Sequence, residues 1–192
     1  MGFSSNGSSS LVKNVFQPPD PRRTLDFLGI YMDCNWQVAE NNQVGNQVKD
    51  CQEAVRQAET FSPDTHIPER RTAYVEYATA LMRDGMGPKA IEMGNKAVAA
   101  TMRSPQDSFG AAAAYAVTGE ALEVSGNLTE ADKELTVAEN YERKGLHSLT
   151  GRPSKARYLP ALEQILQLHA RVLAALGNPN AAQMKLKEAA SL

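Results

Sequence analysis

Apolar residues recur at helical spacing from residue 23 to the end of the chain, and no segment of this part shows sustained alternation of apolar and polar residues. Ala, Leu, Glu, Lys, Gln and Met, which favour helices, dominate it. Gly, Pro and Ser gather in breaks at residues 62–68, 85–88, 103–108, 125–127, 145–154 and 177–180. Because three of these breaks are only a few residues long, the pattern predicts an all-α chain of antiparallel helical hairpins.

One spacing of small and large residues recurs around three glycines. Around Gly126 the residues at the offsets −11, −7, −4, +5, +9 and +12 are Tyr115, Gly119, Leu122, Ala131, Leu135 and Ala138. Around Gly177 the same offsets hold Leu166, Ala170, Leu173, Ala182, Leu186 and Ala189. Around Gly85 they hold Tyr74, Ala78, Leu81, Ala90, Gly94 and Ala97, where only the large residue at +9 is missing. We expect the small residues to lie where the two helices of a hairpin approach most closely.

These residues resemble the tetratricopeptide repeat (TPR), a helix-turn-helix unit with this signature of small and large positions. The resemblance implies antiparallel helix-turn-helix repeats stacked as a short right-handed TPR-like superhelix. The repeats are expected at about residues 71–104, 112–145 and 158–192, within a helical domain of residues 23–192. The turn glycines are 41 and 51 residues apart, whereas the family repeats about every 34, so longer helices or inserted loops are expected.

A weaker unit is placed at residues 25–65, with a turn near Asn46. Cys51, Val55 and Ala58 stand at matching positions, as does Ala39, while Asn35 and Asn42 occupy places where large apolar residues belong. A true repeat and an irregular helix pair therefore both stay open. Residues 1–22, rich in Ser, Asn, Gly and Pro, are expected to form a disordered or extended tail.

The two cysteines are expected to be free, buried thiols. With the turn near Asn46, Cys34 would lie about 12 Å along the partner helix from Cys51, beyond the reach of a disulfide. Trp36, together with Phe27, Leu28 and Tyr31, is expected in the core, with an exposed anchor for a partner as the alternative.

The sequence offers little chemistry. With 20 basic and 22 acidic residues and no run of one sign, it predicts no nucleic-acid binding, and no apolar stretch is long enough for membrane insertion. The stretch GMGPKA resembles a dinucleotide fingerprint, but that fingerprint needs a preceding strand and a helix is expected there. His66, His147 and His169 are scattered, so we expect no metal, no cofactor and no catalytic residues.

In the proteins it resembles, the first helix of each pair lines a concave groove that holds a peptide segment or a partner helix. Carried onto this chain, the groove residues are Thr72, Val75, Thr79, Met82, Arg83, Ala113, Ala116, Glu120, Glu123, Gln164, Gln167 and Arg171. A subfamily grips a C-terminal carboxylate with Lys, Arg and Asn, where this chain has Val75, Thr79, Ala113 and Ala116. A helix or extended segment therefore suits the groove better than a charged tail.

We expect a non-catalytic scaffold for protein–protein interaction. A small-molecule sensor or enzyme with a site between helices is an alternative, with Glu76, Glu120 and Glu123 as its acid cluster. A homo-oligomeric structural protein is another, in which Met184 and Leu186 would face a second copy, although we expect these two to pack inward. The compartment stays open between the cytoplasm and a periplasmic or secreted location after loss of a leader.

Overall fold

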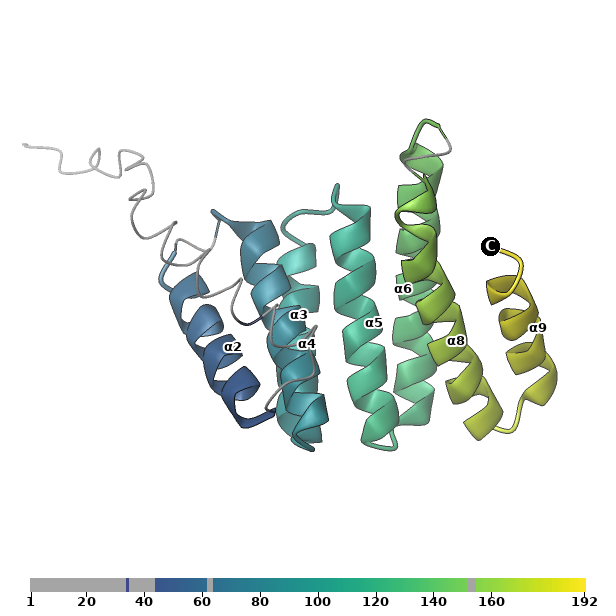
Figure 1. Ribbon diagram of the computed structural model, residues 1–192, viewed down its shortest axis with the longest axis horizontal. Helices are drawn as coiled ribbons and strands as arrows, with labels where there is room; N and C mark the ends of the chain where they lie inside the picture. The colour runs from purple at the N-terminus through teal and green to yellow at the C-terminus, as the bar shows by residue number, and fades with distance from the viewer. Residues whose placement is uncertain (1–33, 35–43, 62–63, 152–154) are drawn as a thin grey trace, which may run out of the picture.

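The computed structural model describes residues 34, 44–61, 64–151 and 155–192. All regular secondary structure in these ranges is helical, which confirms the all-α prediction for this part of the chain. The helices, labelled in Figure 1, are α2 (Val44–Ala58), α3 (Ile67–Arg83), α4 (Gly87–Thr101), α5 (Ser108–Val124), α6 (Leu128–Ser148), α8 (Leu159–Ala175) and α9 (Pro179–Ala189).

The helices form hairpins that stand in a row. Helices α3 and α4, α5 and α6, and α8 and α9 pack as sequential pairs, and the pairs contact one another through α4 with α5 and α6 with α8. Figure 1 shows the row running from α2 at one end to α9 at the other, without a common centre around which the helices bundle. The three hairpins span residues 67–101, 108–148 and 159–189.

The turns of the three hairpins are built alike. Gly85, Gly126 and Gly177 have φ angles of 74°, 80° and 79°, in the left-handed region that favours glycine. In each turn the glycine N–H donates to a carbonyl three residues back, and the next N–H donates to a carbonyl five residues back, as in Asn127 to Leu122 at 2.8 Å. This is the Schellman arrangement, which ends the first helix of each pair and reverses the chain.

The small positions of the recurring spacing lie at close helix approaches. Ala131, Leu135 and Ala138 are fully buried, and a Cβ on Gly119 would come within 2.7 Å of the Leu135 side chain. The one failed position also has a physical reason. A Cβ on Gly94 would lie 3.1 Å from the Thr118 Cα, so a large residue there would separate α4 from α5 of the next hairpin.

The expectation that Met184 and Leu186 pack inward is wrong. Met184 is 74% exposed and Leu186 is 50% exposed, although Ala182 and Ala189 on the same helix are buried. The inner side of α9 packs on α8, and no other described helix covers its outer side.

The prediction of free thiols is also wrong, because Cys34 and Cys51 form a disulfide with a Cα–Cα distance of 4.8 Å. Helix α2 begins at Val44, before the turn expected near Asn46, and this register places Cys51 level with Cys34. Cys51, Val55 and Ala58 are buried in the core, as their spacing suggests. The expectations for residues 1–22, Phe27, Leu28, Tyr31, Asn35, Trp36, Ala39 and Asn42 lie outside the described residues.

An ionic contact joins the first helices of two neighbouring hairpins. Arg71 on α3 is 2% exposed, and its guanidinium bonds the carboxylate of Asp107. Asp107 is also the N-cap of α5, where its other oxygen accepts a 3.0 Å hydrogen bond from the Gly110 N–H. One carboxylate therefore both starts α5 and attaches it to α3.

Buried charges attach α8 and α9 to α6. His169 on α8 contacts Glu139 through Nδ1 and Asp132 through Nε2, the second at 2.7 Å. Lys185 on α9 donates to both oxygens of Glu139, at 2.7 and 2.6 Å. Burial opposes ionisation of Glu139, but these hydrogen bonds outweigh it and lower its pKa to about 2. Burial also opposes the charged form of His169, which by itself would lower its pKa, but its two carboxylate partners raise the pKa above its usual value.

Candidate functional site

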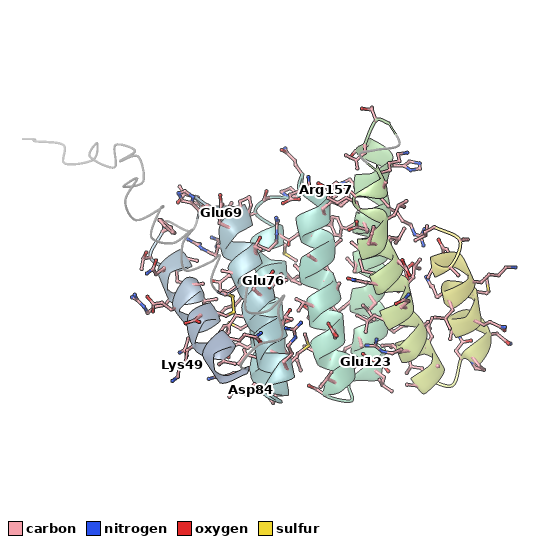
Figure 2. All side chains as sticks on the ribbon, in the orientation of Figure 1. Lys49, Glu69, Glu76, Asp84, Glu123 and Arg157 are labelled. Carbon is pink, nitrogen blue, oxygen red and sulfur yellow. A yellow bond between two sulfur atoms is a disulfide. The ribbon has the colours of Figure 1, made fainter. Side chains whose placement is uncertain are left out.

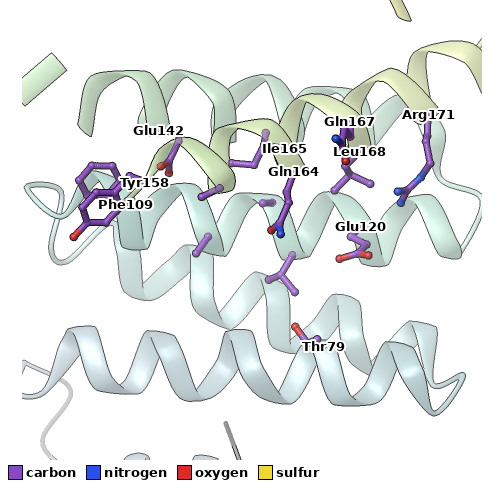
Figure 3. Close-up of a pocket in the computed structure, with 14 residues that line it drawn as sticks. Thr79, Phe109, Glu120, Glu142, Tyr158, Gln164, Ile165, Gln167, Leu168 and Arg171 are labelled. Carbon is purple, nitrogen blue, oxygen red and sulfur yellow. The ribbon is translucent and has the colours of Figure 1, made fainter. Parts of the chain in front are cut away.

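A pocket of about 430 Å³ opens between the first helices of the hairpins. Helix α5 contributes one wall and α8 the opposite wall, while α3 and α6 each add one residue (Figure 3). The lining residues are Thr79, Phe109, Ala113, Ala116, Val117, Glu120, Glu142, Tyr158, Ala161, Gln164, Ile165, Gln167, Leu168 and Arg171. Its middle is therefore mainly alanine and branched aliphatic side chains, with the amides of two glutamines beside them.

Aromatic rings form one end of the pocket. Phe109, at the start of α5, stacks on Tyr158, the N-cap of α8, with ring centroids 3.9 Å apart and planes 13° from parallel. A Cβ on Gly145 would come within 2.7 Å of the Phe109 ring, so the absence of a side chain there lets the ring lie directly against α6.

An ion pair forms the other end. Arg171 on α8 donates to both carboxylate oxygens of Glu123 on α5, at 3.1 and 2.8 Å, and thus bridges the two walls. Glu120, one turn before Glu123 on α5, lies at the same end of the pocket as Arg171 (Figure 3). From Phe109 to Glu120 the wall of α5 is about 16 Å long at the helical rise.

The structure brings seven of the twelve expected groove residues into this pocket: Thr79, Ala113, Ala116, Glu120, Gln164, Gln167 and Arg171. Thr72, Val75, Met82 and Arg83 on α3 lie outside its lining, and Glu123 acts through its bond to Arg171. Val75 and Met82 are partly buried against the core, so only part of each side chain is accessible to a ligand.

The three acids expected to form a cluster, Glu76, Glu120 and Glu123, lie in different environments. Burial raises the pKa of Glu120, and Arg171 opposes this only in part. Burial also raises the pKa of Glu76 on α3, against the effect of Arg83, but Glu76 does not line the pocket. Glu123 is engaged by Arg171 at the end of α5, well along the molecule from Glu76 (Figure 2).

Sequence reasoning missed Glu142, a buried acid in the pocket wall. Glu142 on α6 is 2% exposed, and its buried Oε1 accepts no hydrogen bond from any described residue. Burial raises the pKa of Glu142 to about 7. The signal was present, because Glu142 stands four residues after Ala138 and seven after Leu135, on the apolar stripe of its helix.

The described part of the chain contains no cluster of three His, Cys, Asp or Glu side chains that could hold a metal ion. Within the same ranges, no helix has the length and apolar character needed to cross a membrane. The segment before the GMGPKA stretch is helix α3, and the stretch itself is the turn between α3 and α4 with the first residues of α4, so it lacks the strand that a dinucleotide fingerprint requires.

Solved structures resemble most of the chain. The chain superposes on the crystal structure of the apo form of RapI with a TM-score of 0.68 at 14% identity, over 87% of this chain and 42% of RapI. It also superposes on a protein from Podosopora anserina described as kinesin light chain nearly identical TPR-like repeats, with a TM-score of 0.57 at 19% identity, over 85% of each chain. A second crystal structure of those repeats gives a TM-score of 0.57 at 18% identity, over 90% of this chain and 95% of the other.

No protein-family model and no curated protein sequence matches the chain. The structural matches show that it has a TPR-like helical-repeat fold, as the spacing around the turn glycines predicts. The chain spans less than half the length of RapI.

Proposed function

We propose that this chain is a non-catalytic scaffold that binds a segment of another protein in the pocket between α3, α5 and α8. The observation that carries the proposal is the place of the pocket. It is lined by the first helices of three successive hairpins and contains seven residues expected from the TPR resemblance. A TPR-like fold is consistent with a protein-interaction role.

The lining suits a short amphipathic segment. Ala116, Val117, Ile165 and Leu168 offer apolar surface, and the amides of Gln164 and Gln167 can donate and accept hydrogen bonds. A wall of about 16 Å accommodates about five residues of extended chain or about three turns of helix. A segment with apolar side chains on one face, in either conformation, would leave few polar groups unpaired in the pocket.

The proposal is tested by selecting random peptides, displayed on phage, against the purified chain. Selected peptides are then measured by titration calorimetry against Ala113→Trp, which fills the pocket from an exposed position of α5. The matched control is Ala174→Trp, at an exposed position of α8 outside the lining. We expect Ala113→Trp to abolish binding and Ala174→Trp to preserve it. Equal binding to both variants would refute the groove as the site.

A small-molecule sensor is a second candidate because one observation favours it. The pocket volume lies in the range of small-molecule sites, and Glu120 and Glu142 both have a pKa raised by burial in its wall. A metabolite that elutes with the purified protein, and that Ala113→Trp fails to retain, would support this candidate over the scaffold.

Self-association is a separate proposal that concerns α9. Met184 and Leu186 present an apolar surface there, which a second copy could cover. Light scattering at several protein concentrations tests it: a mass that stays at one chain removes the homo-oligomer.

A further inference from the structure

Glu142 is buried in a way that leaves its charge uncompensated. It is 2% exposed, its Oε1 has no hydrogen-bond partner among the described residues, and it belongs to the wall of the pocket. An unpaired buried carboxylate bears the full desolvation cost of the group with no hydrogen bond to offset it. A group held at such a cost beside a pocket is a candidate for pairing with a ligand.

Glu139, on the same helix and three residues earlier, is a buried acid whose charge is balanced by bonded cationic partners. It is bonded by His169, by Lys185 and, at 3.3 Å, by Arg143. Glu142 has no such set, and burial is the one cause of its raised pKa. The charge that would balance Glu142 is therefore absent from its described surroundings.

The arginine in the pocket lining and the arginine next to Glu142 on α6 are both engaged elsewhere. Arg171 bridges to Glu123 at the opposite end of the pocket, and Arg143 bonds Glu139 and, at 2.7 Å, Glu188. With Glu120 at one end and Glu142 at the other, the lining carries two carboxyls and one arginine that is already paired. Charge complementarity thus favours a positively charged group on the ligand.

The neighbours of Glu142 suit a cation on an alkyl stem. The stacked rings of Phe109 and Tyr158 lie at the same end of the pocket (Figure 3). Aromatic faces attract ammonium and guanidinium groups and pack against the methylenes that carry them. A buried carboxylate beside such rings combines a charge partner with an apolar wall.

We propose that Glu142, with Phe109 and Tyr158 beside it, receives the cationic end of a lysine or arginine side chain of the bound segment. The inference rests on the scaffold function proposed above, and it adds the chemical class of one side chain of the partner. Pairing would replace the missing hydrogen bond of the Glu142 carboxylate and keep it ionised.

The test uses the peptides selected against the intact chain. In each peptide that Ala113→Trp fails to bind, every lysine is replaced by norleucine and every arginine by citrulline, which remove the charge and keep the length. We expect one such replacement to weaken binding about tenfold or more. Glu142→Gln should weaken the parent peptide to a similar extent, and the replaced peptide should bind Glu142→Gln and the unmodified chain equally.

Glu134→Gln is the matched control. Glu134 is an acid of the same helix with a pKa raised by burial, and one of its buried oxygens has no hydrogen-bond partner among the described residues. It is not part of the pocket lining. Glu134→Gln should leave peptide affinity unchanged. Thermal unfolding of both variants verifies folding. Independently of any variant, carboxyl NMR of Glu142 should show its pKa falling when the parent peptide binds.

The outcomes separate the two proposals. Two results would overturn the cation subsite and leave the scaffold proposal intact. In the first, peptides bind in the groove and tolerate the replacement of every basic residue. In the second, the affinity losses from the peptide replacement and from Glu142→Gln are additive. Failure to select any groove-binding peptide overturns both. If n-butylammonium shifts the carboxyl resonance of Glu142 while no peptide binds, the cation comes from a small molecule and the peptide assignment is wrong.

Discussion

The guanidinium of Arg71 lies where a side chain on Gly110 would begin. A Cβ on Gly110 would overlap Nη2, Cζ and Nε of Arg71, so the absence of a side chain on α5 makes room for a buried arginine from α3. Arg71 then reaches Asp107 at the N-terminus of α5. This relationship sets how closely two first helices approach, and these helices contribute to the walls of the pocket.

Gly110→Ala is expected to lower the free energy of unfolding by about 1–3 kcal/mol, because the added methyl displaces the guanidinium of Arg71. Urea unfolding measures the loss. In an Arg71→Met background the same substitution should cost much less, since Cζ and Nη2, the two atoms that overlap most, are gone. Equal costs in both backgrounds would show that the two residues do not share this space.

Glu139→Gln is expected to destabilise the protein at neutral pH by about 2–3 kcal/mol. The pKa of Glu139 is lowered to about 2 in the folded protein from a reference value of 4.5, so its contribution is complete above pH 4.5 and is lost as the pH falls toward 2. Urea unfolding at pH 7 and pH 3 should therefore show a difference between variant and parent that shrinks with acid. Glu130→Gln, on an exposed part of α6, serves as the control and should change stability little at either pH. A constant penalty across the range would mean that the ion pairs are not its source.

Glu142→Gln is expected to have the opposite sign. The pKa of Glu142 is raised from 4.5 to about 7, so the folded state binds more protons than the unfolded state between these values and the parent loses stability as the pH rises through them. At pH 8 the variant should be more stable by about 2 kcal/mol, and at pH 4.5 the two should be close. Denaturation at both pH values decides this. A variant less stable than the parent at pH 8 would show that the carboxylate has a partner in the free protein.

Reduction of the Cys34–Cys51 disulfide is expected to lower the free energy of unfolding by about 3 kcal/mol, the value for a loop of this length. Unfolding with and without a phosphine reductant measures the change, and a Cys34→Ser/Cys51→Ser variant should be insensitive to the reductant. Alkylation of two thiols in the unreduced protein, seen by mass spectrometry, would contradict the pairing.

The turns and the close approaches of the hairpins were predictable because they depend on local backbone and on side-chain size. Gly126 needs a left-handed φ, and Ala131 and Ala138 are small because a neighbouring helix lies against them. Seven pocket residues could be placed through the resemblance for the same reason, since a regular stack fixes which helix faces inward.

The charged interior was not predictable from spacing. Glu142 and Arg71 both belong to the apolar stripes of their helices. Only the packing of other segments shows that Arg71 is paired with Asp107, whereas Glu142 has a buried oxygen without a partner among the described residues. The prediction of free thiols was wrong because it depended on the register of α2, and an earlier start of this helix moves Cys51 relative to Cys34. Leu186 fits the repeat signature, yet that signature does not show whether another helix covers it or the neighbouring Met184.

The most direct test of the central claim is NMR of the alanine methyl groups while a selected peptide is added. Ala113, Ala116 and Ala161 line the pocket, whereas Ala54 and Ala182 are buried in other parts of the stack. Binding between α5 and α8 predicts that the resonances of the first three move and that those of Ala54 and Ala182 stay in place. Shifts confined to Ala54 or Ala182, with the pocket methyls unmoved, would contradict the groove as the binding surface.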